Sequence, residues 1–406
     1  MKRRMSFGPG LLVTAAFIGP GTITTATLAG AGFGFTLLWA LVFSIAATIV
    51  LQEMSARLGL VTRKGLGEAL RTTFTTPVAR ITLMLLVVSA IALGNCAFQT
   101  GNIIGAAMGL EMLTGVNRSA GALMVGLAAF SMLAVGGYRL IERMLMALVA
   151  VMGVVFILTA IVSRPGLTDV LKGLLVPSIP HGSLVTIIAL IGTTVVPYNL
   201  FLHAGAVTRK WPASTSVRIS LREARWDGAL SIALGGLISL AVMATAAAFT
   251  MGGAAIDGPA AMAEPLRPLL GAAGRPLFAV GLVAAGLTSA ITAPFAAAYA
   301  TTGVLGWDSG LQTWKFRAVW ATVIAVGTTL AMMGGNPISA ILFAQAANGW
   351  LLPIIAGFLL VAMNRKALLG DYTNRVLANV LGAGVVLVVS GLGFVKLVKV
   401  ARAIWP

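Results

Sequence analysis

Apolar stretches of roughly 20 residues recur along the whole of this chain, and each is long enough to cross the hydrocarbon core of a bilayer as one helix. Hydrophobic residues make up 58% of the 406 residues and charged residues only 10%. An ordinary soluble domain has about a quarter charged residues. A soluble helical core would need polar outer faces, which these stretches lack. The sequence therefore predicts an all-α polytopic membrane protein.

We expect eleven crossings joined by short connections, with no linker that would separate independent domains. The expected crossings are 10–32, 36–56, 81–110, 119–137, 144–163, 183–207, 228–251, 276–303, 318–334, 337–362 and 376–395.

The net charge of +17 is distributed unevenly between the two sets of alternate connections. One set, which begins with the N-terminal segment, holds 20 of the 28 Lys and Arg residues, and the other set holds eight. Positive connections stay in the cytoplasm, so we expect a cytoplasmic N-terminus and an external C-terminus in a bacterial-type inner membrane. The basic charge then has anionic lipid headgroups as partners, and nucleic acid is not needed to explain it.

The basic segment MKRRMSFGPG precedes the first crossing and has no cleavage site before a soluble domain. We interpret residues 1–9 as a retained cytoplasmic tail rather than as a signal peptide. The single cysteine, Cys96, excludes an internal disulfide, and the two histidines, His181 and His203, are too few for a histidine metal cluster. No nucleophile, base and orienting group occur together, so neither an enzyme nor a cofactor is expected.

Two of the expected crossings are interrupted. The first contains Gly19-Pro20-Gly21, and the sixth contains Pro197 within the polar segment 193–198. The breaks lie five crossings apart, and paired broken helices in two halves are typical of inverted-repeat transporters with a midplane site. We therefore expect a five-plus-five inverted repeat (10–163 and 183–362) with an added helix at 376–398. The alternative is that the two prolines only kink their helices.

Three segments carry a resemblance to a known family: GPGLLVTAAFIGPGT at the first break, QEMSARLGLVTRKGL after the second crossing and IGTTVVPYNLFLHAGAV in the sixth. Together with the order of crossings, they resemble the NRAMP family of proton-coupled divalent metal transporters over nearly the whole chain. The resemblance implies a LeuT-like fold, which agrees with the inverted repeat.

The residues that bind metal in the family are replaced here. The family's Asp and Asn at the first break correspond to Gly19 and Thr22. In the sixth crossing, the positions of its alanine carbonyl and its methionine thioether are Thr193 and Val196. Without carboxylate or sulfur, a dehydrated divalent ion would be held weakly. We expect no high-affinity metal site.

The family's proton-transfer residues are also changed. An Asp and a Glu in the third crossing correspond to Gln99 and Asn102, which cannot titrate, and only His203 keeps the family's residue type. We interpret these three as a former proton path. We expect each of the eleven acidic residues at a helix end or in a connection and none at mid-membrane, where an acid would mark an ion route.

The substrate is expected at the two breaks and at one residue of the tenth crossing. The predicted binding residues are Gly19, Pro20, Gly21, Thr22, Thr193, Val196, Pro197, Tyr198 and Gln345.

Three functions are compatible with this neutral site. The first is an NRAMP-like secondary transporter of a metal cation, weak for transition metals and not coupled to protons. The second is a transporter of a small organic or anionic solute that contacts the backbone N–H groups of 19–22, since GPGTI resembles the glycine-rich break of LeuT-like amino-acid transporters. The third is a non-transporting sensor derived from the family.

Overall fold

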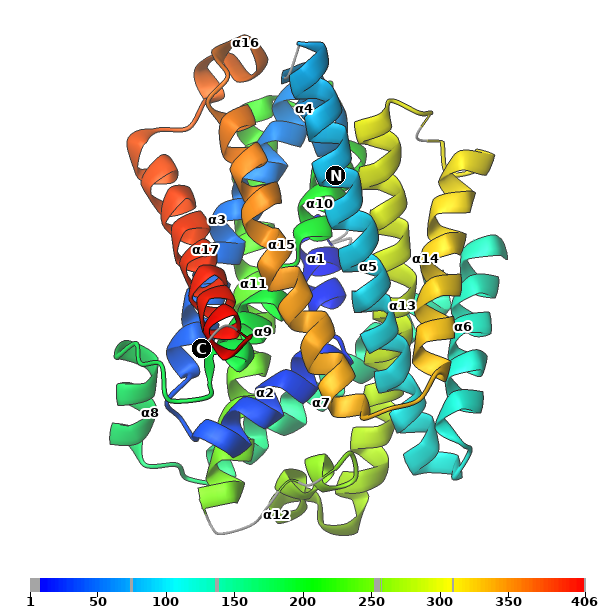
Figure 1. The fold of residues 1–406 in the computed structure, drawn as a ribbon, viewed down its shortest axis with the longest axis vertical. Coiled ribbons are helices and arrows are strands. Elements are labelled where there is room, and N and C mark those ends of the chain that lie inside the picture. Colours follow the sequence, from blue (N-terminus) through cyan, green and yellow to red (C-terminus); the bar gives the residue numbers. More distant parts are fainter. Residues whose placement is uncertain are drawn as a thin grey trace, which may run out of the picture.

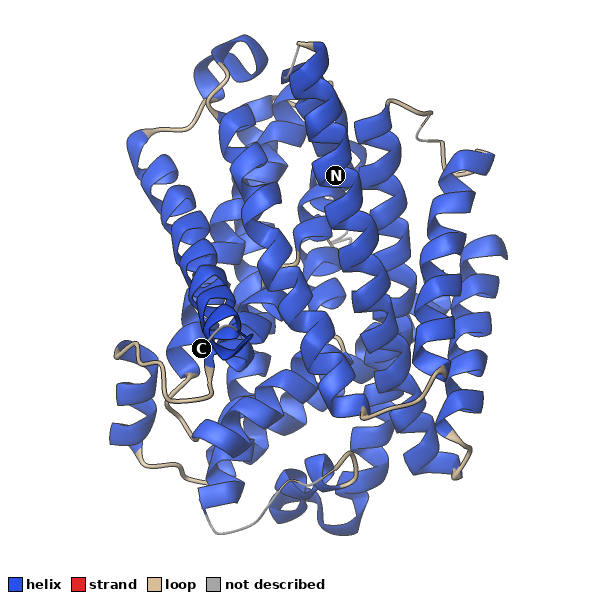
Figure 2. Cartoon of the chain, viewed as in Figure 1, coloured by secondary structure: helices blue, strands red, loops and turns tan. Residues whose placement is uncertain are grey.

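The computed structural model describes residues 8–73, 76–135, 139–251, 256, 258–308 and 310–404. Every regular element in this part of the chain is a helix (Figure 2), which confirms the predicted all-α class. Long helices occur at all eleven expected positions: α1 (Pro9–Phe17) with α2 (Pro20–Phe33), α3 (Leu38–Thr62), α5 (Pro77–Thr114), α6 (Arg118–Val135), α7 (Arg139–Val162), α9 (Leu184–Thr194) with α10 (Pro197–Lys210), α11 (Val217–Met251), α13 (Gly274–Leu305), α14 (Trp314–Met332), α15 (Pro337–Met363) and α17 (Val376–Ile404).

The connections contain short helices that were not predicted from the sequence. These are α4 (Leu66–Thr73), α8 (Leu167–Leu175), η1 (Ala261–Leu266), α12 (Arg267–Leu270), η2 (Gly271–Ala273), α16 (Lys366–Leu369) and η3 (Gly370–Tyr372). Figure 1 shows α4 and α16 at one end of the molecule and α8 and α12 at the opposite end. The connections expected in the cytoplasm and outside are thus separated in space.

Nine helices of the described chain are long and apolar enough to cross a membrane, and ten if α1 and α2, bent by 55°, form one crossing. The chain is therefore an integral membrane protein by length and composition of its helices. α14 is not among the ten, so the number of eleven crossings stays a prediction. Several helices extend beyond the expected ranges, and α11 begins eleven residues earlier than position 228, because charged helix ends project past the apolar stretch.

The helices are packed around the broken pairs. α5 lies along α13, α14 and α15, while α11 packs against α2 and α3. In the pair formed by α9 and α10, 94% of the most apolar stretch is buried inside the molecule, compared with 22% in α17. The second break is therefore central, whereas α17 is peripheral and lies at one edge in Figure 1.

Candidate functional site

The two breaks have the same backbone geometry. At the first, Ile18 (φ −79°, ψ 66°) is followed by extended Gly19. At the second, Val195 (φ −92°, ψ 72°) is followed by extended Val196. Pro20 and Pro197 then begin helices of 14 residues each. An inverted repeat predicts this correspondence, while the relation between the complete halves stays a prediction.

Proline explains why both helices stop. Pro20 and Pro197 have no N–H, so neither can donate to the carbonyl four residues earlier, which belongs to Ala16 or Thr193. Both prolines instead occupy the first turn of a new helix, where no donor is needed. Side chains replace part of the lost bonding, since the Thr22 hydroxyl donates to the Phe17 carbonyl and Thr48 Oγ1 to the Thr194 carbonyl (3.3 Å). Non-helical backbone buried inside a protein can be tolerated in a membrane helix when its polar groups find such partners.

A direct hydrogen bond joins the two breaks. Thr22 Oγ1 lies 2.7 Å from Thr193 Oγ1, and both side chains are almost fully buried. These are two of the predicted binding residues, and they lie 171 positions apart in the chain. The carbonyl ends of α1 and α9, which are partially negative, therefore meet the N-terminal ends of α2 and α10, which are partially positive.

Gln345 of α15 closes one side of this junction. A Cβ atom at Gly21 would lie 2.0 Å from Gln345 Nε2, and a Cβ atom at Gly192 would lie 2.1 Å from the Gln345 carbonyl oxygen. A methyl group at Gly21 would displace the Gln345 side chain, whereas at Gly192 the contact is with backbone and only glycine permits the approach. The side chain of Gln345 therefore lies beside the first break, and its backbone lies beside the helix that leads to the second.

Asn102 and Ser289 lie beside the first break. A Cβ atom at Gly19 would lie 2.7 Å from Ser289 Oγ of α13 and 3.6 Å from Asn102 Oδ1 of α5. One predicted proton-path residue, Asn102, is thus next to the predicted binding residues.

The polar atoms of this cluster are buried and largely without partners. Both amide atoms of Asn102 and of Gln345, together with Ser289 Oγ, have no hydrogen-bond partner in the described chain, although all three side chains are 0% exposed. Such groups are costly in an apolar interior unless something else satisfies them. None of these converging side chains is charged, and the described residues contain no group of three or more His, Cys, Asp or Glu that could hold a metal ion. The arrangement can form hydrogen bonds and can bind through dipoles.

Gln99 has a structural partner. Its Nε2 donates to the Ala290 carbonyl (3.0 Å), and Pro294 is four residues after Ala290 inside α13. Because Pro294 has no N–H, the Ala290 carbonyl loses its helical donor, and the Gln99 amide replaces that donor. A carboxylate could not do this.

His203 lies in a different contact. Its Nδ1 donates to Gln52 Oε1 of α3 at 3.0 Å, and its Nε2 has no partner in the described chain. No hydrogen bond of the described chain joins any two of Gln99, Asn102 and His203. Gln99 and Asn102 are three residues apart in α5, whereas His203 belongs to α10 and contacts α3, and a former proton path through the three stays a prediction.

Tyr198 and Val196 fill space at the second break. The Tyr198 ring packs edge-to-face on Phe98, with centroids 5.4 Å apart, and Val196 is buried as the residue before α10. The Tyr198 hydroxyl has no partner in the described chain. Tyr198 lines a cavity of about 10 Å³ with Asn95 and Asn348. That volume is close to the minimum for one water molecule.

The acidic residues differ from the expectation in three places. Glu53 lies inside α3, and Glu223 and Asp227 lie inside α11, rather than at a helix end or in a connection. Glu223 Oε2 accepts the Trp211 Nε1–H (2.6 Å). Glu53 pairs with Arg57 (3.1 Å) and Arg225 (2.8 Å), and Asp227 Oδ2 accepts the Gly10 N–H (2.8 Å) at the start of α1. Arginine pairs and a helix N-terminus stabilise these two charges.

Asn199 and Gln52 were not predicted as site residues. Asn199 follows Tyr198 in the first turn of α10, is 1% exposed, and has no partner for either amide atom in the described chain. A polar residue directly after the Pro197 break is the sequence signal that could have identified it. Gln52, an amide in an otherwise apolar run of α3, could have been identified as a partner for a buried histidine.

A family model described as natural resistance-associated macrophage protein-like (Nramp) matches residues 10–399. The divalent metal cation transporter MntH of Klebsiella pneumoniae strain 342 is 30% identical over 95% of this chain and 92% of its own length. MntH of Yersinia enterocolitica is also 30% identical, over 97% of this chain and 94% of its own length.

Solved structures agree on the fold. A manganese transporter of Eremococcus coleocola superposes with a TM-score of 0.76 at 23% identity, covering 98% of this chain and 88% of that chain. MhsT, solved with L-phenylalanine, superposes with a TM-score of 0.67 at 16% identity, covering 98% and 99% of the two chains. The architecture is therefore that of the NRAMP transporters, which is LeuT-like. The match over residues 10–399 and the full-length relatives establish that this chain belongs to the NRAMP family.

Proposed function

We propose that this chain is a secondary transporter of a metal cation whose midplane site is neutral, so that it binds transition metals weakly and moves its substrate without protons. The relatives named as divalent metal cation transporters support the class of substrate. The observation that carries the proposal is the junction of the two breaks at Thr22 and Thr193, surrounded by the uncharged side chains of Asn102, Ser289 and Gln345.

The chemistry of these groups decides the kind of ion. Hard divalent cations require carboxylates with carbonyls and waters, and softer ones accept nitrogen or sulfur. Hydroxyl, amide and carbonyl oxygens can replace part of a hydration shell but supply no formal negative charge. The unpartnered amides of Asn102 and Gln345 also present N–H donors, which a bare cation cannot use and water oxygen can. These groups favour a monovalent ion or a divalent ion that keeps most of its water.

Proton coupling is not supported by the side chains present. Gln99 is occupied with the Ala290 carbonyl, Asn102 cannot titrate, and His203 binds Gln52. We propose that the substrate moves along its own gradient or with another ion, with the N-terminus on the cytoplasmic side.

A second candidate is a small organic solute with a carboxylate or amide group. The same unpartnered N–H donors of Asn102, Asn199 and Gln345 favour it, since they would bind an acceptor directly. The half-helix N-termini of α2 and α10 would add partial positive charge.

Uptake by purified protein in proteoliposomes tests these two candidates. Divalent metals, Na⁺ and amino acids are offered one at a time, and Gly21→Ala is compared with Gly32→Ala. Both glycines lie in α2, but a methyl group at Gly21 meets Gln345, whereas nothing lies within 4 Å of one at Gly32. We expect saturable uptake of a cation that falls in Gly21→Ala and persists in Gly32→Ala. Saturable uptake of amino acids alone would favour the second candidate, and no saturable uptake would contradict both.

A further inference from the structure

A basic cavity of about 870 Å³, which includes none of the break residues in its lining, lies between α3, the start of α11 and the start of α17. Five arginines line it: Arg57, Arg218, Arg222, Arg225 and Arg375. Asp371 and Tyr372 of η3, together with Thr373, also contribute, and η3 directly follows α16, so the cavity is at the end of the molecule that carries α4 and α16. This is the end expected to face the cytoplasm.

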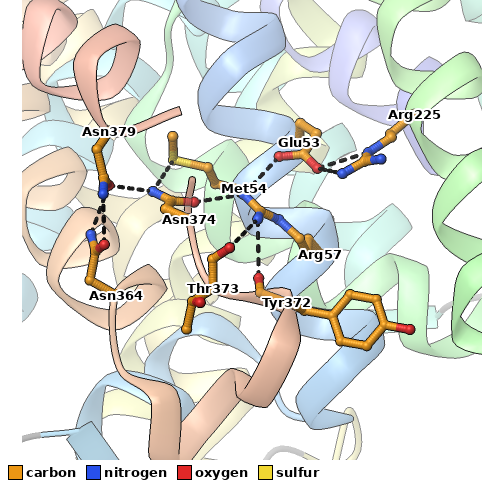
Figure 3. Close-up of polar contacts among 9 residues, drawn as sticks. All are labelled: Glu53, Met54, Arg57, Arg225, Asn364, Tyr372, Thr373, Asn374 and Asn379. Carbon is orange, nitrogen blue, oxygen red and sulfur yellow. Dashed lines mark hydrogen bonds and ion pairs between the residues drawn. The ribbon is translucent and has the colours of Figure 1, made fainter. Parts of the chain in front are cut away.

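Two of the five arginines are already bound within the protein. Glu53 pairs with Arg57 and Arg225, and Arg57 also donates to the carbonyls of Tyr372 (3.1 Å) and Thr373 (3.3 Å), as Figure 3 shows. These bonds link α3, α11 and the segment before α17, and we call this linked base of the cavity the Glu53–Arg57 floor.

The other three arginines carry uncompensated charge. Arg218, Arg222 and Arg375 are exposed, and they take part in no ion pair among the described residues. Besides Glu53, the one acid of the described lining is Asp371, which is also exposed. The lining therefore has a clear excess of positive charge.

The positions of these arginines make their positive charge electrostatically unfavourable. Arg218, Arg222 and Arg225 have the spacing of one helix face in the first nine residues of α11, and Arg375 directly precedes α17. Helix N-termini favour negative charge, and like charges four residues apart repel each other. An anion between these two helix ends would remove both penalties.

Exposed apolar side chains continue from the cavity along α11. Trp226 lines the cavity and is 70% exposed, and Leu230 and Leu234 follow it at four-residue intervals, exposed by 62% and 54%. On α17, Leu377 of the lining is 69% exposed. Both helices pack against α3. Tryptophan is enriched at the level of lipid headgroups, and the leucines suit acyl chains.

We propose that this cavity binds the phosphate of an anionic phospholipid from the adjacent leaflet, with the acyl chains along Trp226, Leu230 and Leu377. Arg218, Arg222 and Arg375 contact the phosphate, and the lipid bridges α11 and α17 over the Glu53–Arg57 floor. Basic pockets between transmembrane helices on the cytoplasmic side recognise headgroups of this charge. A soluble anion would need the arginines but not the apolar flank.

Delipidated full-length protein in detergent tests this proposal, with phosphatidylglycerol and phosphatidylcholine as probes and with native mass spectrometry and thermal unfolding as readouts. The triple variant Arg218→Gln, Arg222→Gln, Arg375→Gln is compared with Lys64→Gln, Arg365→Gln, Lys366→Gln. The control variant removes the same charge from exposed residues of the same end that do not line the cavity. Arg222→Gln alone serves as a milder variant.

We expect phosphatidylglycerol to remain bound to wild type and control and to raise their unfolding temperature. We expect the triple variant to lose roughly a hundredfold in affinity, since each basic side chain near the lipid surface contributes about a fivefold factor, and Arg222→Gln to lose about one such factor. Equal retention of phosphatidylglycerol by the triple variant, or equal binding of phosphatidylcholine, would overturn the proposal. Stabilisation by inorganic phosphate or glycerol phosphate equal to that by the lipid would overturn it in favour of a soluble anion.

Discussion

At the scale of single residues, Gln99 has a structural role that requires a permanent hydrogen-bond donor. The Ala290 carbonyl has no helical donor because Pro294 follows four residues later, and the Gln99 amide donates to it permanently. An acid would do so only while protonated. The amide at this position is therefore linked to the integrity of α13.

This gives a pH-dependent prediction for Gln99→Glu. The introduced carboxyl group can donate to the Ala290 carbonyl when protonated, whereas the carboxylate would oppose the carbonyl dipole. We expect the unfolding temperature, relative to wild type, to fall as the pH rises from about 5 to about 8. Gln99→Leu is the control. It should be destabilised by about 1–3 kcal/mol at every pH, since the carbonyl is left without a donor. A Gln99→Glu protein whose relative stability is independent of pH would contradict this role of the amide.

Restoring an acid at the first break requires a second change, because a Cβ atom at Gly19 would lie 2.7 Å from Ser289 Oγ. We expect Gly19→Asp alone to lower stability and Gly19→Asp with Ser289→Ala to recover it. Adding Thr22→Asn and Val196→Met to this pair should raise the affinity for Mn²⁺, measured by calorimetry, well above that of wild type. Unchanged affinity in the stable combined variant would mean that the scaffold, and not the missing ligands, limits metal binding.

At the scale of elements, the site depends on how closely α9 approaches α15. A Cβ atom at Gly192 would lie 2.1 Å from the Gln345 carbonyl oxygen and 2.4 Å from the Gly349 nitrogen. Both are backbone atoms, so the contact cannot relax by a side-chain rotation. The position of Gln345 beside the first break is thus set by a glycine near the second.

We therefore expect Gly192→Ala to separate the two helices, to lower the free energy of unfolding by about 1–3 kcal/mol and to abolish uptake. Gly357→Ala on α15 is the matched control, since nothing lies within 4 Å of its added methyl group and alanine favours the helix by roughly 1 kcal/mol. Thermal unfolding in detergent and proteoliposome uptake measure the two effects. Loss of uptake in both variants, or in neither, would contradict the claim that the close approach of α9 to α15 at Gly192 is needed for uptake.

At the scale of the whole molecule, the sequence was sufficient for the helices and both breaks, because apolar length and proline leave clear patterns. It could not give the direction in which each side chain faces, since lipid-facing and buried positions of a membrane helix are both apolar. The contact of His203 with Gln52, the proximity of Asn102 to Gly19, and the unpartnered amide of Asn199 all depend on that direction.

The proposed absence of proton coupling is a property of the whole molecule and can be measured directly. If no side chain carries a proton across the molecule, substrate uptake into proteoliposomes should leave the pH of the lumen nearly unchanged, as reported by an enclosed pH dye. Collapse of an imposed pH gradient with an ionophore should not alter the initial rate. A proton influx proportional to substrate uptake would contradict uncoupled transport.

Calorimetric titration of Mn²⁺ into the purified protein is the most direct test of the central claim that the junction of the two breaks has no fixed negative charge. We predict weak binding, or none, in wild type and no change in Thr22→Ala. Micromolar affinity that Thr22→Ala abolishes would contradict the account, because a neutral hydroxyl and carbonyl set would then be holding a dehydrated divalent ion.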